Sequence, residues 1–193
     1  MKKFTGWSQG TRAVEGKKEG ENFLKNILNI LNIQTLQLTP GNKFHSVKSE
    51  LESNNYMSPD FVINCPNTFK IKFKNRLQYL FLESKFKQIN GSDWEKLESN
   101  FGYHHHFYNN LSELFDKNIR IQTIVILVGF WKILQKNYWN FIDYYKSTYG
   151  EFVIFDFGFK EDIYTFARLM DIKLNKEQEQ KIEEAWIKVH KID

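Results

Sequence analysis

One run of ten residues constrains the fold of this chain more than any other segment. Residues 119–128 read IRIQTIVILV, which is mostly apolar and rich in β-branched side chains. Such a run favours a buried strand, because β-branched residues pack well on a pleated surface. A buried strand needs other elements packed against it, so the rest of the chain has to supply them.

The segments on either side of this run predict those elements. Strands are predicted from apolar runs, or from alternation of apolar and Lys side chains, at residues 61–64, 69–74, 79–86 and 151–157. Helices are predicted at residues 21–32, 93–110, 131–149, 160–170 and 176–191, with Asn175 as the N-cap of the last. Residues 1–20 hold four glycines and are expected to form an irregular lead-in. The order of elements predicts an α/β fold with a mixed central β-sheet flanked by helices.

Length and composition are those of one compact unit. The 193 residues predict a single domain spanning residues 1–193. The only cysteine, Cys65, excludes an intrachain disulfide and a zinc site built on a CxxC motif. No apolar run resembles a signal peptide or is long enough to span a bilayer, so we expect a cytoplasmic protein without a membrane partner. A net charge of +4 is compatible with a DNA partner but does not indicate one by itself.

Three charged residues on predicted strands form the most informative pattern. Asp60 opens one strand, and Glu83 and Lys85 lie two residues apart on another. Because side chains alternate between the faces of a strand, Glu83 and Lys85 share one face. If the two strands pair, all three groups converge at one place.

Such a set suits the hydrolysis of a phosphodiester. Mg²⁺ takes oxygen ligands and often only one or two carboxylates, which Asp60 and Glu83 can supply, and the backbone carbonyl of Ser84 offers a further oxygen. Bound metal polarises the scissile phosphate and lowers the pKa of an attacking water. Lys85 is suited to orient that water or to stabilise the charge on the phosphate in the transition state.

The pattern SPDF at residues 58–61 followed by LESK at residues 82–85 resembles the PD-(D/E)xK nuclease superfamily, and most of all its type II restriction endonucleases. The resemblance implies a restriction-endonuclease-like core. It also implies that Asp60 and Glu83 bind Mg²⁺, that Lys85 is catalytic and that the first helix adds a carboxylate. Glu21 is the best match for that carboxylate, with Glu19 and Glu15 as substitutes.

The segment after the lysine, KFKQINGSDWEKL, also resembles some restriction enzymes. From it we expect a set of DNA contacts: Lys87, Gln88, Ser92, Asp93 and Lys96. The resemblance predicts a site-specific endonuclease that cleaves double-stranded DNA with Mg²⁺, works as a homodimer and has a cognate DNA methyltransferase as a possible partner. The alternatives are a structure-specific or repair nuclease of the same fold, such as a junction resolvase, a non-catalytic DNA-binding module, and a protein-interaction domain.

Each of these residues also has a simpler interpretation. Asp60, Glu83 and Lys85 would also fit a surface ion pair at a strand end, and Glu21 would fit the preference of helix N-termini for carboxylates. Ser92 also fits an N-cap. Two other groups remain open, because they fit a surface as well as a binding role: the run at residues 104–106 (HHH) and the alternating lysines at 70, 72 and 74. The aromatic residues of 131–149 fit a core better than a surface for stacking bases.

Overall fold

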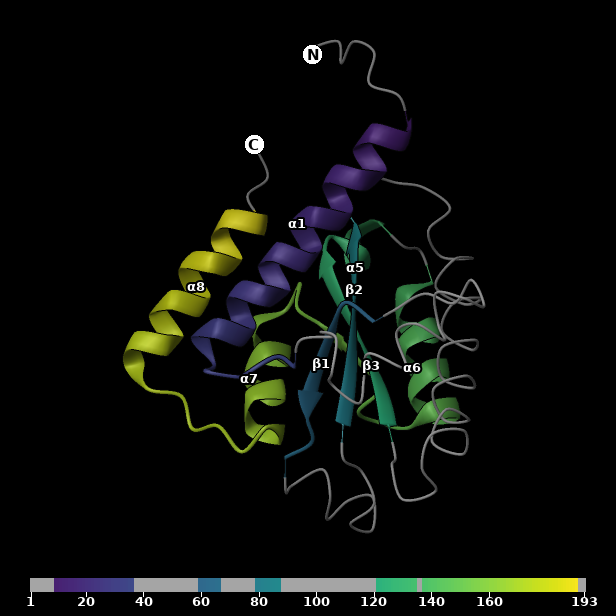
Figure 1. Cartoon of the computed structure of the whole chain (residues 1–193). Coiled ribbons are helices and arrows are strands. Elements are labelled where there is room, and N and C mark those ends of the chain that lie inside the picture. Colours follow the sequence, from purple (N-terminus) through teal and green to yellow (C-terminus); the bar gives the residue numbers. More distant parts are fainter. Residues whose placement is uncertain (1–8, 37–58, 67–78, 88–120, 135–136, 191–193) are drawn as a thin grey trace, which may run out of the picture.

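The computed structural model describes residues 9–36, 59–66, 79–87, 121–134 and 137–190. In chain order its elements are α1 (Gln9–Ile30), β1 (Phe61–Asn64), β2 (Tyr79–Lys87), β3 (Ile121–Gly129), α5 (Trp131–Leu134), α6 (Tyr138–Tyr149), β4 (Ile154–Asp156), α7 (Lys160–Leu169) and α8 (Lys176–His190) (Figure 1). The strand predicted at residues 69–74 and the helix predicted at 93–110 lie outside the described residues.

The described strands form one mixed sheet in the order β1-β2-β3-β4. β1 is antiparallel to β2, with Phe61 opposite Leu82. β2, β3 and β4 run parallel to one another, so their carboxyl ends lie at one edge of the sheet. The register places Lys85 beside Leu127, and Leu127 beside Asp156. The expected mixed α/β architecture, with helices flanking the sheet, is confirmed.

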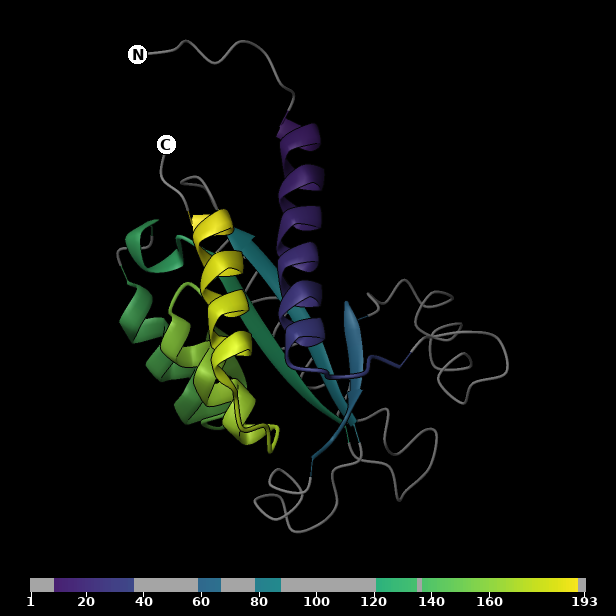
Figure 2. The same ribbon diagram turned by 90° about the vertical axis from the view of Figure 1, so that its left-hand side faces the viewer.

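Helices cover both faces of this sheet. α1, α7 and α8 lie on one side and α6 lies on the other, as Figures 1 and 2 show. Alternate residues of β3 divide between these layers: Ile124 and Ile126 pack with α1 and α7, whereas Val125 and Leu127 pack with Trp131 and α6. β3 is buried along its whole length, which explains why its sequence is nearly continuous in apolar residues.

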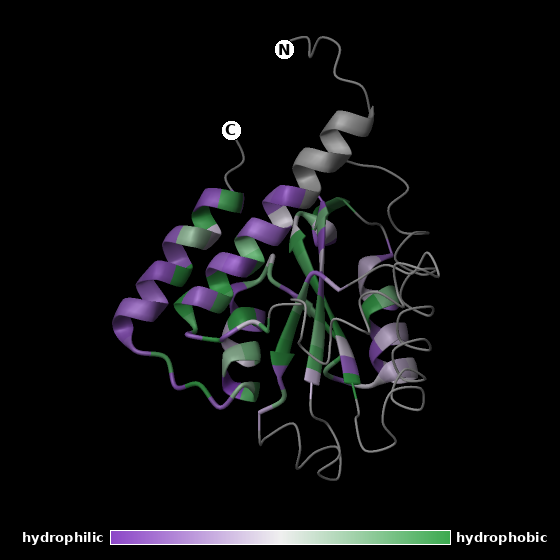
Figure 3. Cartoon of the chain, in the orientation of Figure 1, coloured by the Kyte–Doolittle hydropathy of each residue, from purple (hydrophilic) through white to green (hydrophobic). Residues whose placement is uncertain are grey.

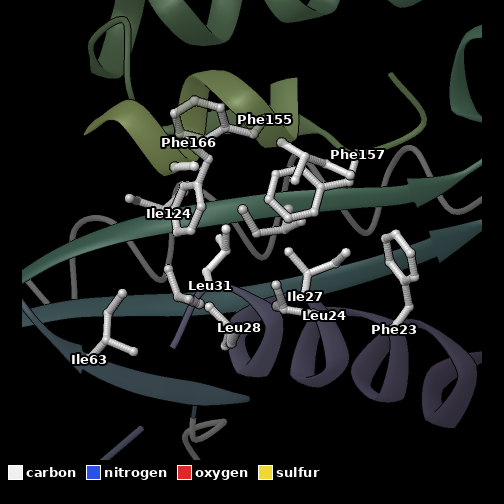
Figure 4. Packing of buried hydrophobic residues seen from close by; sticks show 14 of the residues in the cluster. Phe23, Leu24, Ile27, Leu28, Leu31, Ile63, Ile124, Phe155, Phe157 and Phe166 are labelled. Carbon is white, nitrogen blue, oxygen red and sulfur yellow. The ribbon is translucent and has the colours of Figure 1, made fainter. Parts of the chain in front are cut away.

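The main core lies between the sheet and α1. Four of its side chains come from one stripe of α1: Phe23, Leu24, Ile27 and Leu28 (Figure 4). They share this core with three aromatic residues: Phe155 of β4, Phe157 directly after β4 and Phe166 of α7. Figure 3 shows that the hydrophobic residues of α8 lie along part of its surface, with hydrophilic residues on the rest. Among the described residues, no helix is both long and apolar enough to cross a membrane.

The expected irregular lead-in at residues 1–20 is wrong from Gln9 onward, because α1 begins there. Gly20 explains why glycine was a misleading signal. A Cβ built on Gly20 would lie 2.7 Å from the Cβ of Phe86 and 3.0 Å from Oγ of Ser84. Glycine at this position therefore lets α1 approach β2 closely, and packing outweighs its low helix propensity.

Smaller differences concern the second half of the chain. The helix predicted at 131–149 is two helices, α5 and α6, and β4 is three residues long instead of seven. The N-cap at Asn175 is confirmed, since its Oδ1 accepts a hydrogen bond from the backbone N–H of Gln178 at 2.9 Å. Gln178 Oε1 accepts in turn from the N–H of Asn175 at 3.2 Å, which completes a capping box.

Candidate active site

Strand pairing brings Asp60 to β2. Phe61 pairs with Leu82, so Asp60, one residue earlier, lies beside Glu83 at the point where β1 begins. Oδ2 of Asp60 accepts a hydrogen bond of 2.7 Å from the backbone N–H of Ser84. The aspartate therefore continues the pairing of the strands with a side chain where the backbone ladder stops. The convergence that the sequence predicted is present in the structure.

Glu83 and Lys85 form a close ion pair beside this aspartate. Nζ of Lys85 lies 2.7 Å from Oε1 of Glu83, and the two side chains are 24% and 7% exposed. The other carboxylate oxygen, Glu83 Oε2, is buried and has no hydrogen-bond partner among the described residues. A buried carboxylate oxygen without a partner carries a large desolvation cost, which a cation would remove.

The two faces of β2 carry different kinds of contact at this point. Ser84 faces α1, where its Oγ lies against Gly20. Side chains alternate along a strand, so Glu83 and Lys85 project from the opposite face. The helix α1 therefore fixes the strand from behind, while the charged groups stand on the other side.

The surroundings of the Asp60 carboxyl group disfavour its ionised form. Burial, the neighbouring Glu83 carboxylate and the more weakly acting Glu21 raise its pKa from 3.8 to about 7, against the opposing effects of the Ser84 N–H and of Lys85. Two carboxylates held this close resist being ionised together unless a positive charge joins them. This is the electrostatic condition in which a divalent cation is bound well.

The donor set fits Mg²⁺. Asp60 and Glu83 offer carboxylate oxygens. The carbonyl of Ser84 points to the same strand edge as its own N–H, which faces Asp60. Among the described residues no group of three or more His, Cys, Asp or Glu side chains forms a metal site, but Mg²⁺ typically uses one or two carboxylates together with water and substrate oxygens. These three residues would hold the ion.

Other predicted residues are placed less directly. Glu21 lies on α1, is partly buried and is near enough to raise the pKa of Asp60, so its catalytic role stays a prediction. Lys87 is 1% exposed, and its ammonium group lies 5.1 Å from the centre of the Trp131 ring. This burial does not fit a contact with a phosphate at the surface, and its expected DNA contact stays a prediction. The remaining expected DNA contacts lie outside the described residues, as do the lysines and histidines left open above: Gln88, Ser92, Asp93, Lys96, and positions 70, 72, 74 and 104–106.

The sequence did not indicate the role of Trp131 at this site. Its indole N–H donates a hydrogen bond of 2.9 Å to the backbone carbonyl of Lys85, and the ring is 1% exposed. It was expected to be a core residue, which is confirmed, but its polar end also fixes the strand that carries the lysine. The same expectation is wrong for Trp139 and Tyr144, which are 55% and 56% exposed. Only the three-dimensional pairing of α5 with β2 reveals this contact.

Comparisons with models of protein families, with curated proteins and with solved structures found no match to this chain.

Proposed function

We propose that this chain is a Mg²⁺-dependent DNA endonuclease with the PD-(D/E)xK core, and that it acts as a type II restriction endonuclease on double-stranded DNA. The observation that carries the proposal is the convergence of Asp60, Glu83 and Lys85 around a buried carboxylate oxygen that has no partner in the described part of the chain. An ion pair at a strand end needs no second carboxylate beside it, and Asp60 supplies one at an electrostatic cost.

The residues have separate roles in this mechanism. Asp60, Glu83 and the Ser84 carbonyl would hold Mg²⁺, which supplies Lewis-acid chemistry at the scissile phosphate. Lys85, whose ammonium group donates a hydrogen bond to Glu83 in this structure, would stabilise the charge that develops on the phosphate or orient the attacking water. Trp131 would keep the lysine in place through its hydrogen bond to the strand.

Partners follow from the same proposal. Double-stranded DNA is the substrate, a homodimer would place one site on each strand of a palindrome, and a cognate methyltransferase would protect the host sequence. The dimer and the methyltransferase are proposed from the family resemblance alone. The cytoplasmic location is proposed from the composition of the chain.

The proposal is tested by incubating the purified chain with phage DNA in Mg²⁺ and, in parallel, in EDTA. Discrete fragments that require Mg²⁺ would support a restriction enzyme, and mapping their ends would give the recognition sequence. DNA that stays intact with every metal would count against an endonuclease. Cutting confined to branched or gapped substrates would instead select the structure-specific alternative, which the exposed aromatic surface described next favours.

A further inference from the structure

A cluster of one lysine and two aromatic rings lies on the surface beside the candidate site. Trp139 and Phe159 stack with their ring centres 6.3 Å apart and a tilt of 29°. Nζ of Lys132 lies over both rings, 5.2 Å from the centre of Trp139 and 4.8 Å from that of Phe159. We name these three residues the lysine–aromatic cluster.

The cluster is exposed although it is rich in apolar surface. Trp139 is 55% exposed, and Ile133, next to Lys132 in α5, is 72% exposed. Large aromatic side chains are usually well buried, so an exposed tryptophan is an unusual feature of a protein surface. Asp156, which interacts electrostatically with Lys132, accepts hydrogen bonds from Tyr138 and from the N–H of Gly158.

The sheet places this cluster at the same edge as the candidate site. Lys85 is two strands away from Asp156 through Leu127, which corresponds to about 10 Å at a strand spacing of about 4.8 Å. The hydroxyl of Tyr138, the residue before Trp139, donates to Asp156 at 2.6 Å. On the other side, Lys132 follows Trp131, whose indole is bonded to the carbonyl of Lys85.

Two stacked aromatic rings with an ammonium group over them match the chemistry of a nucleotide. A base stacks on an aromatic ring without regard to its sequence, and the phosphate next to it pairs with the cation. Bases inside a duplex are already stacked on one another, so only an unpaired nucleotide can use such a surface. Asp156, which accepts a hydrogen bond from the residue before Trp139, lies about 10 Å from Lys85, a separation that one DNA strand could span.

We propose that the lysine–aromatic cluster binds an unpaired nucleotide of single-stranded DNA next to the position of cleavage. The inference rests on the proposed nuclease function, because it names the part of the DNA that the candidate site would receive. It predicts tighter binding to DNA with a gap, a flap or a single-stranded end than to a continuous duplex, which is the behaviour of the structure-specific nuclease named above as the alternative to a restriction enzyme.

The test measures binding in EDTA, so that it does not depend on cutting. The probes are a fluorescent oligothymidylate, a duplex of the same length and a duplex with a short gap. Trp139→Ala should weaken binding of the oligothymidylate by about 5- to 150-fold, as the loss of one stacked base does. Lys132→Gln should reduce the slope of log affinity against log salt by about 0.7.

Ile187→Ala is the matched control, because Ile187 is an exposed apolar residue on α8, in the layer across the sheet. The proposal is overturned if this variant loses as much affinity as Trp139→Ala. It is equally overturned if the duplex binds as well as the gapped DNA, if only RNA of the same sequence binds, or if Trp139→Ala changes the oligomeric state and leaves DNA binding intact.

The two proposals can fail separately. Binding that is intact in a protein that never cuts DNA would keep the cluster and reject the nuclease. Cutting that persists with no loss of affinity in Trp139→Ala would reject the cluster and keep the nuclease.

Discussion

Replacing Asp60 with asparagine is expected to stabilise this protein in the absence of metal. Asparagine is nearly the same size, and its Oδ1 can still accept the hydrogen bond from the backbone N–H of Ser84. What it removes is the negative charge that burial and the Glu83 carboxylate disfavour. A residue kept for function at a cost in stability behaves in this way.

The magnitude follows from the pKa of Asp60. Its rise from 3.8 to about 7 is roughly three units, and each unit corresponds to about 1.4 kcal/mol. Below the lower value the carboxyl group is protonated in both states and costs nothing. Between the two values the folded state holds the proton more tightly, so the free energy of unfolding falls as the pH rises. Near pH 8 the loss amounts to about 4 kcal/mol, an order-of-magnitude figure.

Urea unfolding of the wild type and of Asp60→Asn, at pH values from about 4 to about 8, measures this effect. The two proteins should be similar at the acidic end, and the variant should be several kcal/mol more stable at the alkaline end. Mg²⁺ should narrow the difference by stabilising the wild type alone. Asp143→Asn, on the exposed side of α6, is the control and should show neither effect. A variant that is less stable at high pH, or that keeps the pH dependence of the wild type, would refute the electrostatic reasoning.

Three further predictions concern the scaffold. Gly20→Ala should lower the free energy of unfolding by about 1–3 kcal/mol in urea, because the new Cβ would clash with Phe86; a gain in stability would show that helix propensity dominates there. His190 accepts a hydrogen bond from the N–H of Gly129, and burial lowers its pKa. The thermal stability of the wild type should therefore fall as the pH drops below 6.5, the ordinary pKa of histidine. Thermal unfolding of His190→Gln should not show this loss of stability at low pH. Asn175→Ala should cost about 1 kcal/mol in the same urea assay through loss of the cap, and an unchanged midpoint would contradict the capping role.

Local signals were sufficient for most of the described fold. The apolar run of β3 and the amphipathic stripe of α1 depend on residues close together in the chain. β3 forms where it was predicted, and α1 includes most of the predicted helix but begins twelve residues earlier, at Gln9. Gly20 shows the limit of such signals, since a glycine suggests a break unless its neighbour in space is known. The prediction for β4 was too long, because Glu151 and Phe152 lie in the turn before the strand and do not extend it.

The candidate site divides in the same way. Alternation along one strand predicted that Glu83 and Lys85 share a face. Their meeting with Asp60 needed the pairing of β1 with β2, which the sequence allowed but did not establish. The hydrogen bond from Trp131 and the burial of Lys87 depend on how α5 returns to the end of β2, and no local pattern encodes that return.

The most direct test of the nuclease proposal is DNA cleavage in Mg²⁺ by the wild type, by Lys85→Met and by Lys181→Met. Both lysines form an ion pair with a glutamate, at 2.7 Å for Lys85 and at 2.6 Å for Lys181, but the second pair lies on the exposed surface of α8. We predict that the wild type and Lys181→Met cut DNA at equal rates, while Lys85→Met binds DNA and leaves it intact. Cutting by Lys85→Met at the rate of the wild type would contradict the assignment of the active site.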